Sequence, residues 1–244
     1  MSAFDPFDEN LAEIINIPYF FYLVDHPEGR VLFDSGAHPA FITDPRSRLG
    51  DAADQWQIEM RPNDDVVSQL ATLGVSTSDI SHVALSHLHY DHAGGVEFFP
   101  EATFYVQREE LPFAYWPPVY QRGVYVRKDF DHPVAWKELR GRYDVFGDGS
   151  VVLFPTPGHT PGHQSMLVRL DGRPVILIGD AAYLPGKMRD RILPAASLVW
   201  SPDAMVHSWE EIEDLERQHD AELLFTHNLH WEGNTKIAPD EWYE

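Results

Sequence analysis

The chain has 244 residues, of which 43% are hydrophobic and 13% aromatic, a composition typical of a globular protein long enough to bury a large core. Its 18 Lys and Arg against 39 Asp and Glu leave a formal net charge of −21, which disfavours phosphate backbones and anionic membrane surfaces as partners. The absence of cysteine excludes disulfides and thiolate metal sites, so any metal ion must be bound by imidazole and carboxylate groups.

No apolar run approaches the roughly 18 residues of a transmembrane helix. The acidic first ten residues, MSAFDPFDEN, lack the basic and then apolar layout of a signal peptide. We therefore expect a cytoplasmic protein that binds neither a membrane nor a nucleic acid. The length and the lack of a low-complexity linker favour a single domain over residues 1–244.

Short apolar runs bounded by turn residues predict strands in the first half of the chain. These strands cover residues 17–25, 30–36, 82–86 and 103–107, and the turn HPEG joins the first two into a hairpin. The stretch PNDDVVSQLATLGV has the apolar period of a helix that Asn63 or Asp64 can cap. A further helix is expected from Arg108.

Residues 112–144 break this pattern. The stretch LPFAYWPPVYQRGVYV is rich in aromatic residues and proline and has no clean period. Two interpretations remain open: an inserted loop or lid, or a structural excursion that packs on the core.

Regular elements return after this segment. Strands are predicted over residues 151–154, 164–170, 174–178 and 221–227, with an amphipathic helix over 202–220 before the last. The two halves echo each other, because each has strands, then a helix, then a strand that ends at a histidine. This repetition predicts a sandwich of sheets with helices outside.

The stretch LSHLHYDHAGG is the first indication of function. His87, His89, Asp91 and His92 fall within six residues after a predicted strand and run into paired glycines. Further candidate ligands follow later strands: His159 in TPGHTPGH, Asp180 in LIGDAAY and His227 in LLFTHN. A lone histidine at a strand end is more often an ordinary polar residue, but the density of the first cluster favours metal binding.

Side chains at the same edge of neighbouring strands converge in space. Five imidazoles and two carboxylates exceed the roughly four ligands of one zinc ion and suit two ions if one carboxylate bridges them. His163, four residues after His159, is interpreted as structural or as a contact of a ligand.

Four motifs, VLFDSG, SHLHYDHAGG, TPGHTPGHQS and FTHN, closely resemble those of the metallo-β-lactamase superfamily. The resemblance implies an α/β fold of four layers, the αβ/βα sandwich, with two divalent ions at one edge. The ions would be zinc, with manganese, cobalt or iron as alternatives. By resemblance, His87, His89 and His159 hold the first ion. Asp91, His92 and His227 hold the second, and Asp180 bridges the two.

Within the superfamily the chain looks most like the N-acyl-homoserine lactone lactonases, the quorum-quenching enzymes. Its first motif is very near theirs, with Tyr90 where they often have Phe, and FYVQREEL resembles the step that follows it. Tyr183 in GDAAY lies where those enzymes place a tyrosine that contacts the lactone, although a packing aromatic is the alternative. The resemblance implies a homodimer and opening of the lactone ring by a hydroxide shared between the two ions. Asp91 and Tyr183 would be catalytic.

Substrate choice must come from the pocket wall. We expect Tyr90, Trp116 and Tyr120 to contact the substrate, with the aromatic segment closing over an apolar acyl chain. Two departures from the lactonase pattern stand out: Asn228 replaces the usual Asp, and the stretch before Ile17 is short for the opening hairpin.

Other functions fit less well. The β-lactamases of this fold usually have Cys at the position of Asp180, and glyoxalase II carries a C-terminal domain for which the 17 residues after His227 are too few. A hydrolase of another lactone, such as 4-pyridoxolactone, or of a thioester remains open. An iron oxidoreductase or a non-enzymatic metal-binding protein is a more distant alternative.

Overall fold

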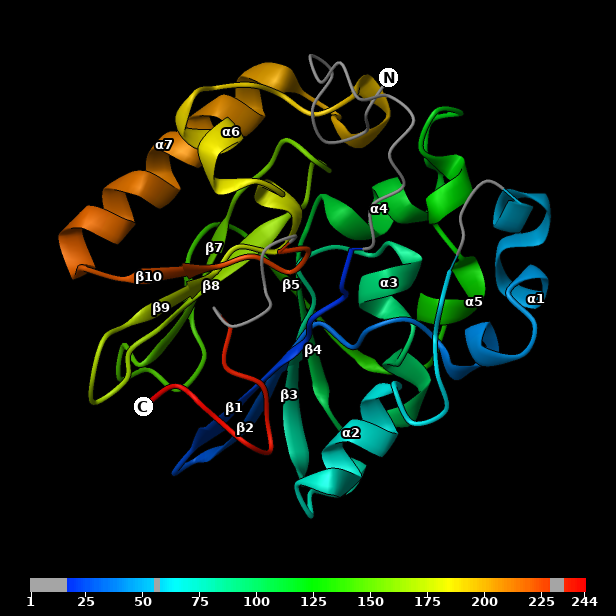
Figure 1. Ribbon diagram of the computed structural model, residues 1–244, viewed down its shortest axis with the longest axis horizontal. Helices are drawn as coiled ribbons and strands as arrows, with labels where there is room; N and C mark the ends of the chain where they lie inside the picture. Colours follow the sequence, from blue (N-terminus) through cyan, green and yellow to red (C-terminus); the bar gives the residue numbers. More distant parts are fainter. Residues whose placement is uncertain (1–16, 55–57, 229–234) are drawn as a thin grey trace. The chain divides into compact units, whose positions relative to one another are not determined.

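The computed structural model describes residues 17–54, 58–228 and 235–244, which form two compact units. The N-terminal unit comprises residues 21–106 and 110–138. The C-terminal unit comprises the described part of 1–20 together with 107–109 and 139–244. The expected shortening of the chain before Ile17 falls outside the described residues. Each unit is built around its own five-stranded sheet (Figure 1).

The sheet of the N-terminal unit has the strand order β1-β2-β3-β4-β5. The strands are β1 (Tyr22–His26), β2 (Gly29–Phe33), β3 (Ile80–Ala84), β4 (Thr103–Gln107) and β5 (Ala135–Leu139). β1 and β2 pair antiparallel, which confirms the predicted hairpin, whereas β2, β3 and β4 run parallel. The carboxyl ends of these parallel strands therefore meet at one edge of the sheet.

The helices of the N-terminal unit are short. They are α1 (Arg46–Leu49), α2 (Val66–Thr72), α3 (Tyr90–Ala93), α4 (Glu110–Tyr115) and α5 (Arg127–Phe130), joined in places by 3-10 turns.

The predicted cap of α2 is wrong by one or two residues. Asp65 caps this helix, because its carboxylate accepts hydrogen bonds from the Ser68 backbone N at 3.0 Å and the Ser68 hydroxyl at 2.7 Å. Asp64 instead closes the preceding turn by accepting from Arg61 N. Asn63 has a left-handed backbone, with φ of 76°.

Residues 112–144 contain regular elements, namely parts of α4, all of α5 and β5, and the two-residue strand β6 (Tyr143–Asp144). Ala114, Tyr125 and Phe130 belong to the hydrophobic core of the N-terminal unit. For these residues the interpretation as a segment that packs on the core is confirmed. Residues 116–120, just after α4, differ, because their large apolar side chains Trp116, Val119 and Tyr120 are exposed.

The sheet of the C-terminal unit has the order β10-β9-β8-β7-β6. Its other strands are β7 (Val151–Pro155), β8 (Gln164–Val168), β9 (Val175–Leu177) and β10 (Glu222–Leu224). β6 to β9 pair antiparallel, and β10 adds to β9 in parallel. β10 ends at Leu224, so His227 lies three residues beyond the strand rather than at its last residue.

The long helix of the C-terminal unit is α7 (Pro202–His219), and α6 (Pro185–Arg189) precedes it. Trp209, Ile212 and Leu215 of α7 are buried in one cluster with Ile176 and Ile178, which confirms the predicted inward face of this helix. Among the described residues, no helix combines the length and the apolar composition that crossing a bilayer requires.

Candidate metal centre

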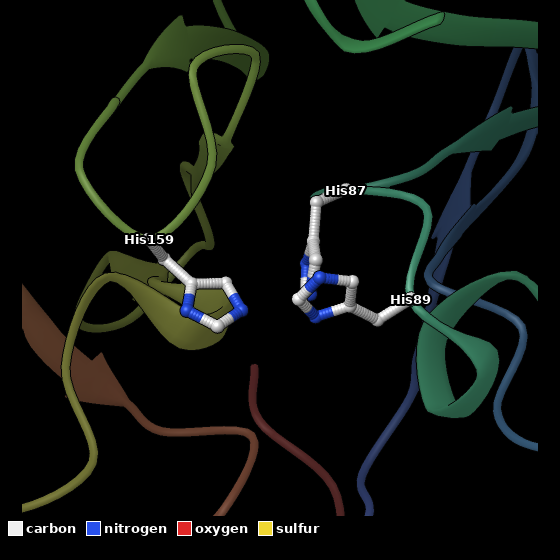
Figure 2. Close-up of side chains that lie close together, drawn as sticks. All are labelled: His87, His89 and His159. Atoms are coloured by element: carbon white, nitrogen blue, oxygen red, sulfur yellow. The ribbon is translucent and has the colours of Figure 1, made fainter. Parts of the chain in front are cut away.

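The N-terminal unit gathers four predicted ligands just beyond the carboxyl end of β3. The His87 ring lies 4.4 Å from the His89 ring and 4.1 Å from the His92 ring, measured between centroids. A carboxylate oxygen of Asp91 lies 3.5 Å from His92 Nε2. Figure 2 shows His87 and His89 extending from one short stretch of chain after β3, and His159 from the loop after β7.

Local backbone geometry explains this clustering. His89 has the extended backbone of a helix N-cap, and the single turn of α3 then carries Asp91 and His92. The turn is held against the chain after β2, since Gly94 N donates to Gly36 O at 2.8 Å. A Cβ on Gly94 would lie 2.3 Å from His38 N, so this close backbone approach requires glycine.

Asp34 is a buried contact of the predicted ligand His92 that the sequence analysis did not single out. Its fully buried carboxylate accepts from Ser86 N at 2.7 Å and lies 2.9 Å from Nδ1 of His92. Burial raises the pKa of the Asp34 carboxyl above its usual range, and the neighbouring His92 acts in the opposite direction. The signal in the sequence was an acidic residue directly after the apolar run of a predicted strand, in VLFDSG. That motif was interpreted only as part of a family resemblance.

The C-terminal unit gathers the other three predicted ligands around one carboxylate. Asp180 Oδ2 lies 3.6 Å from Nε2 of His159, and its Oδ1 lies 3.1 Å from Nε2 of His227. Each oxygen therefore faces a different imidazole, which is the arrangement expected of a carboxylate that bridges two ions. All three side chains are buried.

The second ring nitrogen of each of these histidines is held by a backbone carbonyl. His159 Nδ1–H donates to Leu198 O at 2.7 Å, and His227 Nδ1–H donates to Pro18 O at 2.8 Å. Such bonds fix the tautomer that presents the lone pair of Nε2 to a metal. Neither carbonyl has a side-chain signature, so sequence reasoning had no means of finding these partners.

His163 orients Asp180. Its Nε2 accepts a hydrogen bond from Asp180 N at 3.0 Å, and its Nδ1 lies 2.8 Å from the Thr156 hydroxyl. The ring is fully buried. These contacts agree with the interpretation of His163 as a structural contact of a ligand.

The loop that carries His159 is fixed against α7. Gly158 has φ of +145°, and a Cβ there would lie 2.4 Å from Met205 Cα in that helix. Its carbonyl accepts from Trp200 N at 2.8 Å and Ser201 N at 3.0 Å. The residue before the ligand is thus locked by backbone contacts that a larger side chain would prevent.

Tyr183 lies beside the three ligands of the C-terminal unit. Its hydroxyl donates to Asp180 Oδ2 at 3.1 Å and lies 3.2 Å from His159 Nδ1. Its ring stacks on His227, with centroids 5.9 Å apart. A tyrosine O–H is therefore held next to the carboxylate that is expected to bridge the ions.

The three predicted substrate contacts have different environments. Tyr90 is buried in an apolar cluster with Phe41 and Leu49, whereas Trp116 is 79% exposed and Tyr120 is 54% exposed. The departure at Asn228 leaves a side chain that donates to the Thr235 hydroxyl at 3.3 Å.

The donor set fits divalent cations. Each of the seven predicted ligands offers an imidazole nitrogen or a carboxylate oxygen of a kind that holds a metal ion. Imidazole and carboxylate donors suit zinc and its first-row neighbours, and the buried carbonyl and carboxylate partners behind the rings are typical of metal-binding histidines.

The amino-acid sequence is similar to those of known proteins over most of its length. The sequence profile of the metallo-beta-lactamase superfamily matches residues 17–227. The N-acyl homoserine lactonase AttM of Rhizobium radiobacter is 38% identical over 230 residues, which cover 92% of this chain and 87% of that protein. The N-acyl homoserine lactonase AiiA of Bacillus thuringiensis subsp. kurstaki is 27% identical, with coverage of 94% and 88%.

A solved structure of an N-acyl homoserine lactone hydrolase has the product N-hexanoyl-L-homoserine at its catalytic metal centre. It is 26% identical to this chain, covers 93% of it and 88% of itself, and has a TM-score of 0.81. The predicted α/β class with two sheets and the metallo-β-lactamase fold are thereby confirmed. The chain belongs to the metallo-beta-lactamase superfamily and, within it, to the family of N-acyl homoserine lactonases.

Proposed function

We propose that the protein is a metal-dependent hydrolase that opens the lactone ring of N-acyl homoserine lactones, a quorum-quenching activity. The observation that carries the proposal is the combination of 38% identity to a named N-acyl homoserine lactonase with an Asp180 carboxylate that faces His159 and His227 with separate oxygens. Hydrolysis of another lactone or of a thioester is the alternative that the experiment below separates.

Family and donor chemistry together imply divalent metal ions as cofactors. In the proposed assignment His87, His89 and His159 hold one ion, Asp91, His92 and His227 hold the other, and Asp180 is shared. Zinc is the proposed metal because imidazole-rich sites with carboxylates suit it. When bound, the ions supply hydroxide at neutral pH, because they lower the pKa of a coordinated water from 15.7 toward about 7.

Tyr183 is proposed to stabilise the charge that develops on the lactone carbonyl oxygen. Its O–H donates to Asp180 Oδ2 at 3.1 Å, so it lies beside the carboxylate that the two ions are proposed to share. A donor aimed at a developing oxyanion is typically worth about 3 kcal/mol.

The reaction also needs a proton for the leaving group. As the hydroxide oxygen bonds to the carbonyl carbon, the bond from that carbon to the ring oxygen breaks and leaves an alkoxide. We assign to Asp91 or Asp180 the transfer to this alkoxide of the proton that the attacking hydroxide carried, which leaves a carboxylate and a hydroxyl group on the product. The product is the open-chain N-acyl homoserine, a hydroxy acid.

The acyl chain is proposed to lie against Trp116 and Tyr120, whereas the predicted contact with Tyr90 is not retained because that side chain is buried with Phe41 and Leu49. Support comes from exposed aromatic surface in the stretch between α4 and α5, where Trp116 and Tyr120 lie. A homodimer and a cytoplasmic location stay predictions from the sequence.

The test is an activity panel on purified protein. N-acyl homoserine lactones, 4-pyridoxolactone and a thioester are incubated with enzyme, and the ring-opened or cleaved product is measured by chromatography with and without chelator. We expect homoserine lactone opening that chelator abolishes and zinc restores. Exclusive turnover of 4-pyridoxolactone or the thioester would establish the alternative, and no turnover of any substrate by the zinc-loaded protein would refute a hydrolase.

A matched pair of variants connects the activity to the ligands. Asp91→Asn removes a predicted ligand and proton donor, whereas Asp51→Asn changes a fully exposed carboxylate in the same unit. Only the first variant should lose activity. Full activity in Asp91→Asn would contradict its assignment.

A further inference from the structure

A fully buried carboxylate lies behind the His-x-His segment of the N-terminal unit. Glu110, the first residue of α4, has no exposed surface. Its Oε1 accepts a hydrogen bond from Leu88 N at 3.0 Å and a second from the Tyr125 hydroxyl at 3.1 Å. Leu88 is the residue between His87 and His89, so this carboxylate holds the peptide that separates the two rings.

Tyr125 connects the same carboxylate to one of the rings. Its ring meets that of His89 edge to face, with centroids 4.5 Å apart, and contacts Phe113 on another side at 5.9 Å. The Tyr125 side chain is buried as well. The hydrogen-bonded pair of Glu110 and Tyr125 therefore holds the backbone between His87 and His89, and it also provides the ring against which His89 packs.

The cost of burying the Glu110 carboxylate indicates a specific role for it. Burying a carboxylate is costly unless hydrogen bonds compensate it, and a buried apolar side chain would fill the space behind Leu88 at lower cost. Nδ1 of two other predicted histidine ligands contacts a polar partner, Asp34 in the case of His92 and Leu198 O in the case of His159. The His89 ring also packs against the rings of His87 and Tyr125.

We propose that Glu110 and Tyr125 are positioning residues that set the separation and orientation of His87 and His89 for the first metal ion. Glu110 fixes the backbone of Leu88, and Tyr125 fixes the ring of His89. The inference rests on the proposed metal-dependent function, and it extends that function to residues outside the ligand set.

Two substitutions separate these effects. Glu110→Gln keeps the shape of the side chain but replaces a charged acceptor with a neutral one and adds an amide N–H₂ that needs a partner. Tyr125→Phe removes only the hydroxyl and leaves the ring on His89. The control is Tyr115→Phe, which removes a hydroxyl that donates to Asp131 at 2.9 Å on the exposed surface of the same segment.

The measurements are zinc dissociation constants by chelator competition, the visible absorption spectrum of the cobalt-substituted protein, and the melting temperature of the metal-free protein. Loss of a residue behind a metal ligand typically weakens metal binding by about 10–100-fold. We expect the affinity for one of the two ions to fall by that amount in Glu110→Gln and by a smaller factor of about threefold or more in Tyr125→Phe. The cobalt spectrum should change in both variants. Tyr115→Phe should match the wild type.

Zinc affinities within twofold of the wild type and an unchanged cobalt spectrum in Tyr125→Phe would overturn the proposal, even if Glu110→Gln failed to fold. A lower melting temperature with unchanged affinity and spectrum would show a structural role only and would also overturn it. Metal binding is measured without lactone, so the two hypotheses can fail separately. A wild type that binds zinc but opens no lactone refutes the proposed function, whereas variants that bind zinc normally refute this inference.

Discussion

The group that contacts Nδ1 of a histidine determines whether the lone pair of Nε2 is available to a metal ion. His159 and His227 donate Nδ1–H to backbone carbonyls, whereas His92 Nδ1 lies 2.9 Å from a carboxylate oxygen of Asp34. A carboxylate raises the basicity of its imidazole more than a neutral carbonyl does, because the charge stabilises the proton on Nδ1 and strengthens the lone pair on Nε2. The His92 pair should therefore be the most sensitive to substitution.

Asp34→Asn tests this expectation. The variant replaces the charged partner of His92 with a neutral amide, and we expect zinc affinity at one of the two ions to fall by about 10–100-fold. Chelator competition measures the effect, and Asp25→Asn, which changes an exposed carboxylate in the same unit, is the control. Equal zinc affinities in Asp34→Asn and the control would contradict this role.

Tyr183→Phe tests the proposed oxyanion donor. We expect kcat for lactone opening to fall by about 100-fold, because one hydrogen bond to the developing charge is lost. Zinc content should not change, since the hydroxyl is not one of the proposed ligand atoms. Tyr243→Phe, which removes a hydroxyl bonded to Lys236 N elsewhere in the same unit, is the control. An unchanged kcat in Tyr183→Phe would leave the residue with a packing role.

At the scale of elements, the stretch between α4 and α5 carries the proposed contact with the acyl chain. Trp116 is 79% exposed, so its replacement should cost little stability and should change substrate preference instead. We expect Trp116→Ala to raise KM for long-chain more than for short-chain lactones. Trp242→Ala removes a ring that is 61% exposed and is the matched control. The same chain-length preference in Trp116→Ala and the wild type would contradict the assignment.

The contact of α1 with α5 contains a buried ion pair that responds to pH. Arg48 Nη1 donates to Asp129 Oδ1 at 2.8 Å, and the Asp129 side chain is 1% exposed. Burial raises the pKa of Asp129 from 3.8 to about 7, and the attraction of Arg48 opposes this shift without cancelling it. The folded protein therefore holds this proton more tightly than the unfolded chain does.

The sign of the pH effect follows from this difference. The contribution of Asp129 to stability is fully present below the unfolded pKa near 3.8, and it is lost as pH rises to about 7. Asp129→Asn cannot titrate. We expect its free energy of unfolding, relative to wild type, to rise across that range by at most about 4 kcal/mol and then to level off.

Urea denaturation of the metal-free proteins between pH 4.5 and 8 measures this difference. Asp131→Asn is the control. Hydrogen bonds from Tyr115 and Arg127 lower the pKa of Asp131 below 3.8, so its stabilisation is fully present above that pH and is lost only at lower pH. The stability difference between Asp131→Asn and the wild type should therefore stay constant between pH 4.5 and 8. A stability difference between Asp129→Asn and the wild type that does not vary with pH would disprove the raised pKa of Asp129.

At the scale of the whole molecule, strongly patterned elements were predictable from sequence. The β1–β2 hairpin, β4 and the inward face of α7 match their predictions because local apolar periodicity and burial agree there. Residues 112–144 lack a period, so only tertiary packing fixes their short helices and β5. The early end of β10 at Leu224 likewise reflects pairing with the three-residue strand β9 rather than any break in apolar sequence.

In the candidate site, too, features set by local sequence were predictable and features set by tertiary packing were not. The ligand types were visible because polar side chains are so dense after β3 and recur at later strand ends. The groups that orient them were not visible. Leu198 O and Pro18 O are backbone atoms, and Glu110 is far in sequence from the peptide that it holds.

Titration of metal-free enzyme with zinc, followed by lactone hydrolysis at each ratio, tests the central claim most directly. A hydrolase that uses two ions held by the seven ligands should reach full activity at about two zinc ions per chain, and Asp180→Asn should lose activity and bind fewer ions. Full activity of the wild type at zero or one zinc per chain would contradict the two-ion account.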